Sequence, residues 1–229
     1  LSLGGMRFQQ SWKDLDPNEI NNQQQDILQK TIKHASQKGM HHIETARHYG
    51  TSERQIGWAF GQIDDPKRIV QTKIPPNNNP SIFEKELELS MSRLGSKKID
   101  LLAIHGINLP EHLDMTIRPN GCLEIVRRWQ KDGLVGHVGF STHANVDLII
   151  KTIETGLFDY VNLHWYFIRQ ENERALQAAY ANDMGVFIIS PTDKGGHLHT
   201  PSLKLVDLCS PLHPIEFNDL FCLSDKRIH

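Results

Sequence analysis

Four polar side chains of this sequence could together protonate a carbonyl oxygen. They are a carboxylate, a phenol, an ammonium and an imidazole, from Glu44, Tyr49, Lys73 and His105. A phenol with a pKa of about 10 is a poor acid at neutral pH, but a neighbouring ammonium favours the phenolate and lowers that pKa. A carboxylate keeps the ammonium charged, and an imidazole can hold a carbonyl beside the phenol. The set predicts a general acid that contributes about 10²–10⁴-fold to the rate.

Such an acid is useful when a hydride reaches the carbonyl carbon. No side chain can donate a hydride, so this chemistry requires a cofactor. Each residue also has a plainer interpretation: Glu44 and Lys73 could form a structural ion pair, and Tyr49 or His105 alone could be core residues. The four together favour a functional set.

Seven short apolar runs could form the strands that position these side chains. Most of them carry consecutive apolar residues, as expected when both faces of a sheet are covered. Their starts lie roughly 25–40 residues apart, the length of one strand and one crossover helix. The runs are Leu1–Phe8, His42–Ala46, Arg68–Ile74, Ile99–His105, Val135–Ser141, Tyr160–Trp165 and Gly185–Ser190.

The segments between these runs carry helix signals. Asn79 and Pro80 are a cap residue and a first-turn proline, and Gly95 is a stop signal. Gln9–Gln24 and Gly106–Pro119 are long and polar and are predicted to be loops. Helices are predicted over Gln25–Gly39, from Pro80 to Gly95, and over Asn120–Gly133, Ala144–Gly156 and Glu171–Asp183.

Strict alternation of strands and helices predicts an α/β fold, a (β/α)8 TIM barrel whose eighth strand is missing from this chain. A doubly wound sheet is the alternative, but no G-x-G-x-x-G motif follows the first run. We expect a single barrel domain over residues 1–229. Because the chain begins at Leu1 and stops at His229 without a closing signal, we also expect a fragment truncated at both ends.

Charge and composition exclude several classes of protein. The 229 residues include 25 Lys and Arg against 27 Asp and Glu, whereas nucleic-acid and anionic-membrane binders carry a basic excess. No apolar run approaches the roughly 18–20 residues that span a bilayer. The widely spaced Cys122, Cys209 and Cys222 form neither a disulfide framework nor a metal-ligand set. We expect a cytoplasmic protein without a metal site, a nucleic-acid partner or a membrane partner, and the oligomeric state stays open.

Several motifs resemble the aldo-keto reductase family. HIETARHYGTSE at residues 42–53 is similar to its signature, in which an acid and a tyrosine precede Gly-x-Ser-Glu. The family's other motifs follow in the same order, so the resemblance covers nearly the whole chain. They are QTK at 71–73, IDLLAIH at 99–105, GFST at 139–142 and SPTDKGG at 190–196. The amino-acid sequences of these segments resemble those of a bacterial branch of the family, whose full-length members often carry a C-terminal ferredoxin-like iron–sulfur extension.

The resemblance implies a nicotinamide-dependent reductase of aldehydes or ketones that uses NADPH, with NADH also possible. Tyr49 would be the general acid, Lys73 its pKa modulator, His105 the group that orients the carbonyl, and Glu44 the residue in place of the family aspartate. The cofactor would be held by two sets of residues. Ser141, Thr142 and Asn162 would hold the carboxamide, and Ser190, Lys194, Gly195 and Gly196 would lie in the loop near the pyrophosphate.

Departures from the family pattern leave alternatives open. Glu44 is one methylene longer than aspartate, and Thr142 and Asn162 stand where the family has Asn and Gln. A cofactor-binding module with little or no turnover is therefore a second hypothesis, and a lyase or hydrolase using Glu44 and His105 is a third. His164 could pack or contact substrate, and Trp12 could line a pocket or anchor its loop.

Overall fold

A computed structural model describes residues 1–229, and the contacts within it group into two units. The first unit covers Leu1–Phe140 and the second covers Ser141–His229. The predicted single domain over residues 1–229 stays a prediction.

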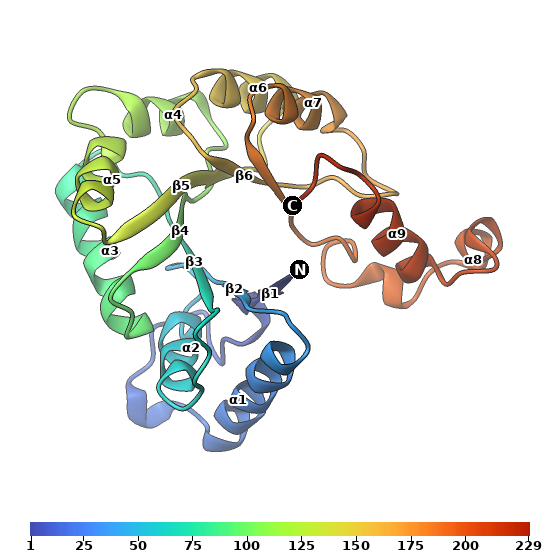
Figure 1. The fold of residues 1–229 in the computed structure, drawn as a ribbon, viewed down its shortest axis with the longest axis horizontal. Helices are drawn as coiled ribbons and strands as arrows, with labels where there is room; N and C mark the ends of the chain where they lie inside the picture. The colour runs from blue at the N-terminus through green and yellow to red at the C-terminus, as the bar shows by residue number, and fades with distance from the viewer. The chain divides into compact units, whose positions relative to one another are not determined.

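The first unit is built on parallel strands that pair in chain order (Figure 1). Glu44 pairs in register with Gln71, and Lys73 pairs with Ala103. Side chains two residues apart on a strand share a face, so Glu44 and Lys73 point to the same side of the sheet. The strands are β1 (Ser2–Gly4), β2 (His42–Glu44), β3 (Ile69–Ile74), β4 (Ile99–Ile104) and β5 (Val135–Ser141), of which Ser141 belongs to the second unit.

Helices separate these strands, and their ends follow local capping chemistry. Asn79 caps α3 by accepting from the Ser81 N–H at 3.1 Å, Pro80 opens it, and Gly95 ends it with a φ of 58°. α1 and α2 pack beside the sheet in Figure 1. The helices are α1 (Asn22–Gln37), α2 (Ser52–Phe60), α3 (Pro80–Leu94), α4 (Pro110–Ile117) and α5 (Cys122–Lys131).

Two helical segments correct the predicted loops. α4 lies inside the segment that was predicted as the loop Gly106–Pro119, because Pro110 opens a helix there instead of interrupting one. A short 3-10 helix, Pro17–Glu19, lies inside the predicted loop Gln9–Gln24, where Asp16 and Glu19 form a capping box. α2 begins at Ser52, within the motif at residues 42–53, and its bounds were not predicted.

The core of the first unit joins the sheet to α1 and α2. Buried aliphatic side chains from these elements pack together, and their burial supplies the main stabilisation of this layer. The cluster consists of Leu28, Ile32, Ile43, Ile56, Ala59, Val70 and Leu94. Because Ile43 and Val70 belong to β2 and β3, this core fixes the strands that carry Glu44 and Lys73.

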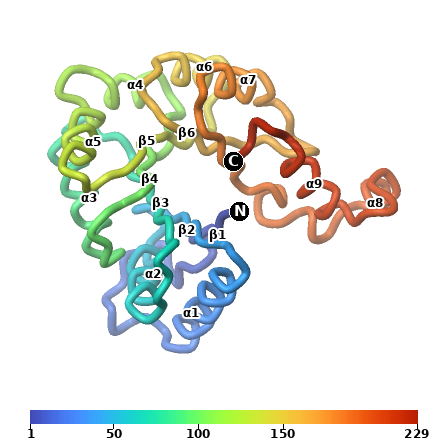
Figure 2. The backbone as a smooth tube through the Cα atoms, in the orientation of Figure 1, coloured from blue at the N-terminus to red at the C-terminus, as the bar shows by residue number.

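The second unit continues the alternation of strands and helices. β6 and β7 pair in parallel, with Asn162 opposite Phe187. Figure 2 shows the chain leaving β7, running through α8 and returning along α9 to the C-terminus. The elements are α6 (Val146–Glu154), β6 (Tyr160–Leu163), α7 (Glu173–Ala181), β7 (Gly185–Ile188), the 3-10 helix His197–His199, α8 (Leu203–Cys209) and α9 (Pro214–Leu223).

Five predicted strands end earlier than expected, among them β2 at Glu44 and β4 at Ile104. β1 stops at Gly4 because a 3-10 turn over Gly5–Arg7 follows it, and β6 and β7 stop at Leu163 and Ile188. The free side of β7 carries one further pairing. The His229 N–H donates to the Val186 carbonyl at 3.0 Å, and the Val186 N–H donates to His229 Nδ1 at 3.2 Å.

None of the helices combines the length and the apolar character that crossing a membrane demands. The cytoplasmic location stays a prediction.

The loop after β1 lies directly on the turn that follows Tyr49. The Thr51 N–H donates to the Ser11 carbonyl at 3.2 Å, and the Gln10 N–H donates to Thr51 Oγ1 at 2.9 Å. Gly50 makes this approach feasible. Its φ is 52°, and a Cβ at this position would overlap the Ser11 carbonyl oxygen.

Substituting Gly50 by alanine should therefore cost far more stability than the same change at Gly95. Gly50→Ala combines a left-handed backbone with a backbone clash, so we expect a loss of more than about 2 kcal/mol. Gly95 also has a positive φ but faces open space, so Gly95→Ala should cost about 1 kcal/mol. Urea unfolding followed by far-UV circular dichroism measures both, and equal losses would contradict the close contact between the Ser11 carbonyl and Gly50.

Candidate active site

The first unit brings the four predicted catalytic side chains to the C-terminal ends of its strands. Glu44 is the last residue of β2, and Lys73 lies near the end of β3. His105 directly follows β4, and its N–H donates to the Ile74 carbonyl at 2.8 Å. Tyr49 lies in the turn between β2 and α2. Strand ends and one short turn therefore position all four groups.

The Lys73 ammonium is buried and satisfied by oxygen atoms. Its Nζ contacts the Glu44 carboxylate and donates to the Thr45 carbonyl at 2.8 Å. The Lys73 side chain is only 3% exposed and that of Glu44 is 13% exposed. The longer glutamate side chain thus still reaches the lysine, and the predicted pairing forms.

Three side chains surround the ring of Tyr49. Lys73 Nζ lies 4.7 Å from its centroid. The His105 ring is edge-on at 5.8 Å between centroids, and the Trp12 ring is edge-on at 6.3 Å. The phenol is therefore next to both a cation and an imidazole, as the proposed chemistry needs.

The acidity of Tyr49 differs from the prediction. Burial raises the pKa of Tyr49 to about 12, whereas we expected the ammonium to lower it. The physical reason lies in where Lys73 directs its hydrogen bonds. Nζ faces the ring and bonds to Glu44 and Thr45, so its charge is matched by the carboxylate. At neutral pH the phenol therefore keeps its proton.

Burial also lowers the pKa of Lys73 well below its ordinary value. The contact with the Glu44 carboxylate acts in the opposite direction, because an opposite charge favours the ammonium. The charge on Lys73 thus depends on Glu44.

Buried hydrogen bonds that were not predicted support this site from beneath. Thr72 donates through Oγ1 to Glu53 Oε1 at 2.6 Å, which ties β3 to α2 beside Lys73. Burial raises the pKa of Glu53. The Thr45 and Ser52 hydroxyls are hydrogen-bonded at 2.8 Å. Ser52 and Glu53 are the last two residues of the Gly-x-Ser-Glu motif, and that motif was the available signal.

The second unit holds the residues predicted to bind the nicotinamide carboxamide. Ser141, Thr142 and Asn162 are all buried. Thr142 Oγ1 accepts from the Ala144 N–H at 3.0 Å, and Asn162 lies within β6. Their roles stay predictions.

The turn after β7 carries the residues predicted to lie near a pyrophosphate. Ser190 has a φ of 52°, and Gly195 and Gly196 have φ values of 90° and 88°. The side chain of Lys194 is exposed. This backbone conformation suits glycine and leaves an exposed cation at the turn.

Two residues that sequence analysis missed fix this turn. Asp193 Oδ1 accepts from the Tyr166 hydroxyl at 2.9 Å. Asn218, on α9, donates through Nδ2 to the Pro191 carbonyl at 3.0 Å and accepts from the Phe167 N–H at 3.0 Å. No local pattern around Asn218 indicates this role, because its partners are distant in the sequence.

The buried side chain of His164 could bind a ligand. It is 7% exposed, and both of its ring nitrogens lack a hydrogen-bond partner. The His143 ring stacks on it at 4.8 Å, and burial lowers the pKa of His164 to about 4, with smaller contributions from His143 and Lys194. A neutral, buried imidazole can hydrogen-bond to a polar ligand group, such as the carboxamide or a hydroxyl of a nicotinamide nucleotide.

Comparison with known proteins identifies the family of this chain and its fold. The model of the Aldo/keto reductase family matches residues 1–212. The holo aldo-keto reductase from Bacillus halodurans has a TM-score of 0.80 and 15% identity, covering 100% of this chain and 79% of its own. The aldo/keto reductase from Klebsiella pneumoniae, in complex with NADP and acetate, has a TM-score of 0.71 and 14% identity, covering 90% and 74%. The search of curated proteins found no match.

A further solved structure shares the fold. The glycerol dehydrogenase from Gluconobacter oxydans has a TM-score of 0.67 and 21% identity, covering 83% of this chain and 59% of its own. These matches confirm the predicted fold class, an incomplete (β/α)8 barrel that contributes seven strands.

Removing the carboxylate of Glu44 should expose the dependence of Lys73 on its counter-charge. Glu44→Gln leaves a buried ammonium unpaired, so we expect a loss of about 3–5 kcal/mol of unfolding free energy at pH 7. In this variant the pKa of Lys73 is lower in the folded than in the unfolded protein. The unfolded state then binds more protons, so stability should rise between pH 7 and pH 9. Urea unfolding across that range measures the effect.

Two further variants serve as controls. Glu44→Gln combined with Lys73→Met should recover most of the lost stability, because no charge is left buried. Glu88→Gln changes an exposed carboxylate and should stay within about 0.5 kcal/mol of the parent. A Glu44→Gln variant as stable as Glu88→Gln would show that the ion pair does not matter.

Proposed function

Because this chain belongs to the aldo/keto reductase family, we propose that it reduces an aldehyde or ketone with NADPH, using Tyr49 as the general acid. Family membership supports the coarser statement that the chain is an oxidoreductase of carbonyl substrates. The choice of NADPH, with NADH as the other possibility, and the role of Tyr49 are the finer parts of the proposal. So is the branch with an iron–sulfur extension.

One observation carries the proposal. A buried lysine paired with a glutamate lies against the ring of a tyrosine, and a histidine ring lies on the same phenol. A purely structural ion pair does not need a phenol and an imidazole beside it. The arrangement therefore favours proton transfer over packing.

The residues of the first unit have distinct tasks in this mechanism. His105 orients the substrate carbonyl, and Tyr49 donates its hydroxyl proton to the carbonyl oxygen. The phenolate that remains is stabilised by Lys73, whose Nζ lies 4.7 Å from the ring centroid. Glu44 keeps that ammonium charged. A pKa of about 12 holds the proton on Tyr49 until the developing negative charge on the carbonyl oxygen accepts it.

The residues of the second unit would hold the cofactor. Ser141, Thr142 and Asn162 would bind the carboxamide, and the turn containing Lys194 would face the pyrophosphate. Ser190, Gly195 and Gly196 shape that turn. When bound, the nicotinamide supplies the hydride that adds to the carbonyl carbon. Support comes from the unpartnered His164 and the exposed Lys194.

The raised pKa of Tyr49 also favours a second candidate, a cofactor-binding module with little turnover. A phenol with a pKa of about 12 is a weak acid at neutral pH. Binding of NADPH without oxidation in the presence of carbonyl substrates would support this candidate.

Removing the hydroxyl of Tyr49 should abolish proton donation while leaving the fold intact. For Tyr49→Phe we expect kcat to fall about 10²–10⁴-fold with unchanged NADPH binding. NADPH oxidation at 340 nm with a panel of aldehydes and ketones measures the rate. Tyr180→Phe, which changes a half-exposed tyrosine on α7, is the matched control and should behave as the parent. A Tyr49→Phe protein with parental kcat would refute the assignment.

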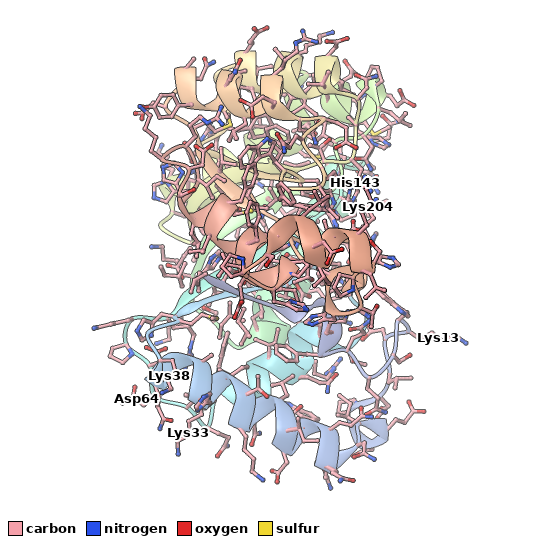
Figure 3. The ribbon with its side chains drawn as sticks, turned by 90° about the vertical axis from the view of Figure 1, so that its right-hand side faces the viewer. Lys13, Lys33, Lys38, Asp64, His143 and Lys204 are labelled. Carbon is pink, nitrogen blue, oxygen red and sulfur yellow. The ribbon has the colours of Figure 1, made fainter.

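Removing the cation of Lys194 should weaken cofactor binding. A charge-assisted hydrogen bond to a phosphate is worth about 1.5–3 kcal/mol, so Lys194→Ala should raise the Kd for NADPH about tenfold or more. Because the pyrophosphate is common to both cofactors, the Kd for NADH should rise by a similar factor. Lys204→Ala, at an exposed lysine of the same unit that is labelled in Figure 3, should leave both constants unchanged. Quenching of tryptophan fluorescence measures binding, and a Lys194→Ala protein with parental affinity would contradict the placement.

A further inference from the structure

The loop between β1 and α1 is held to the candidate active site at two points. The first point is the backbone contact described above. The N–H groups of Gln10 and Ser11 lie 2.9 and 3.4 Å from Thr51 Oγ1, and the Ser11 carbonyl accepts from the Thr51 N–H. Thr51 is two residues after Tyr49, so this contact fixes the loop next to the phenol.

The second point is a cluster of arginines around the carboxylate of Asp14. Arg93 contacts the carboxylate directly, and Nη2 of Arg47 and Nη2 of Arg54 lie 3.8 and 3.9 Å from its oxygens. The side chain of Arg93 is 6% exposed and that of Arg47 is 13% exposed. A carboxylate facing partly buried guanidinium groups is held more firmly than one in an exposed ion pair.

Trp12 lies between these two points. Its ring contacts that of Tyr49 edge-on at 6.3 Å, although the residue is 63% exposed. An exposed ring gains little from burial, so its position depends on the backbone on either side. Lys13, the residue between Trp12 and Asp14, is exposed and points outward in Figure 3. The arginine cluster is thus the anchor on the C-terminal side of Trp12.

We infer that Asp14 is a positioning residue that holds Trp12 beside Tyr49 through the arginine cluster, and so sets how a carbonyl substrate is seated. This inference rests on the proposed function, because it assigns Trp12 to the wall of the substrate site. Asp14 does not touch the reacting atoms. Its effect should fall on substrate binding and not on the chemical step.

The position of Trp12 should depend on salt concentration if Asp14 holds it through charge. The side chain of Asp14 is 40% exposed, so dissolved ions reach one side of the cluster. Added salt screens such charges over about 3 Å at 1 M, compared with about 10 Å at 0.1 M. Salt should therefore loosen Trp12 in the parent protein, and it should have no further effect once the carboxylate is removed.

The mobility of Trp12 can be measured without any enzymatic activity. Acrylamide quenching of the parent minus that of Trp12→Phe isolates the signal of Trp12. In the same way, quenching of the double variant Asp14→Asn, Trp12→Phe is subtracted from that of Asp14→Asn. For Asp14→Asn we expect the quenching constant of Trp12 to rise measurably but by less than twofold, because a ring that is already 63% exposed can gain only its remaining surface. In the parent, 1 M NaCl should produce a similar rise, and in Asp14→Asn it should produce none.

Three variants make the comparison specific. Asp16→Asn removes a charge from the same loop while keeping a side chain able to cap the 3-10 helix, and it should match the parent. Asp14→Glu keeps the charge and should restore quenching towards the parental value. In Arg93→Gln, the further change Asp14→Asn should have a smaller effect than it has in the parent, because the two residues share one interaction. Far-UV circular dichroism confirms that each variant is folded.

Kinetics then tests the link to substrate. With an uncharged aldehyde, Asp14→Asn should raise KM about two- to tenfold and leave kcat within about twofold of the parent. Unchanged quenching of Trp12 in Asp14→Asn would overturn the inference, whether or not the protein is an active reductase. Increased quenching with an unchanged KM would overturn the link to substrate. Absence of any carbonyl reduction by the parent would instead count against the proposed function, since the quenching experiment stands without it.

Discussion

The burial of the Lys73 ammonium is the constraint on which the rest of the candidate site depends. A cation at 3% exposure is tolerable only beside a carboxylate and other oxygen acceptors. Glu44 and the Thr45 carbonyl provide these, and both come from β2 or the residue after it. The register of β2 on β3 places them within reach. The aliphatic core between the sheet and α1 and α2 therefore serves an electrostatic purpose as well as a packing one.

The same burial explains why the phenol behaves differently from a simple ammonium–phenol pair. Low polarity around Tyr49 disfavours the phenolate, and Lys73 has already committed its hydrogen bonds to Glu44 and Thr45. A proton donor of this kind keeps its proton in the resting state. It releases that proton only towards an oxygen that is becoming strongly basic, which is the condition of a carbonyl that receives hydride.

Many of the strands and helices could be predicted from local sequence patterns. The strands β3, β4 and β5 and the helix α3 follow from continuous apolar runs and from the Asn-Pro and Gly signals at helix ends. α4 was missed because a proline and charged residues in a short segment resemble a loop. The raised pKa of Tyr49 could not be predicted, since it depends on where Lys73 Nζ points. Asn218 was also out of reach, because its two partners lie more than 25 residues away.

The close contact between the Ser11 carbonyl and Gly50 affects which positions of the loop can be substituted. Since the Ser11 carbonyl is fixed to the Thr51 N–H, a substitution of an exposed side chain further along the loop, such as Lys13, should leave the tyrosine turn in place.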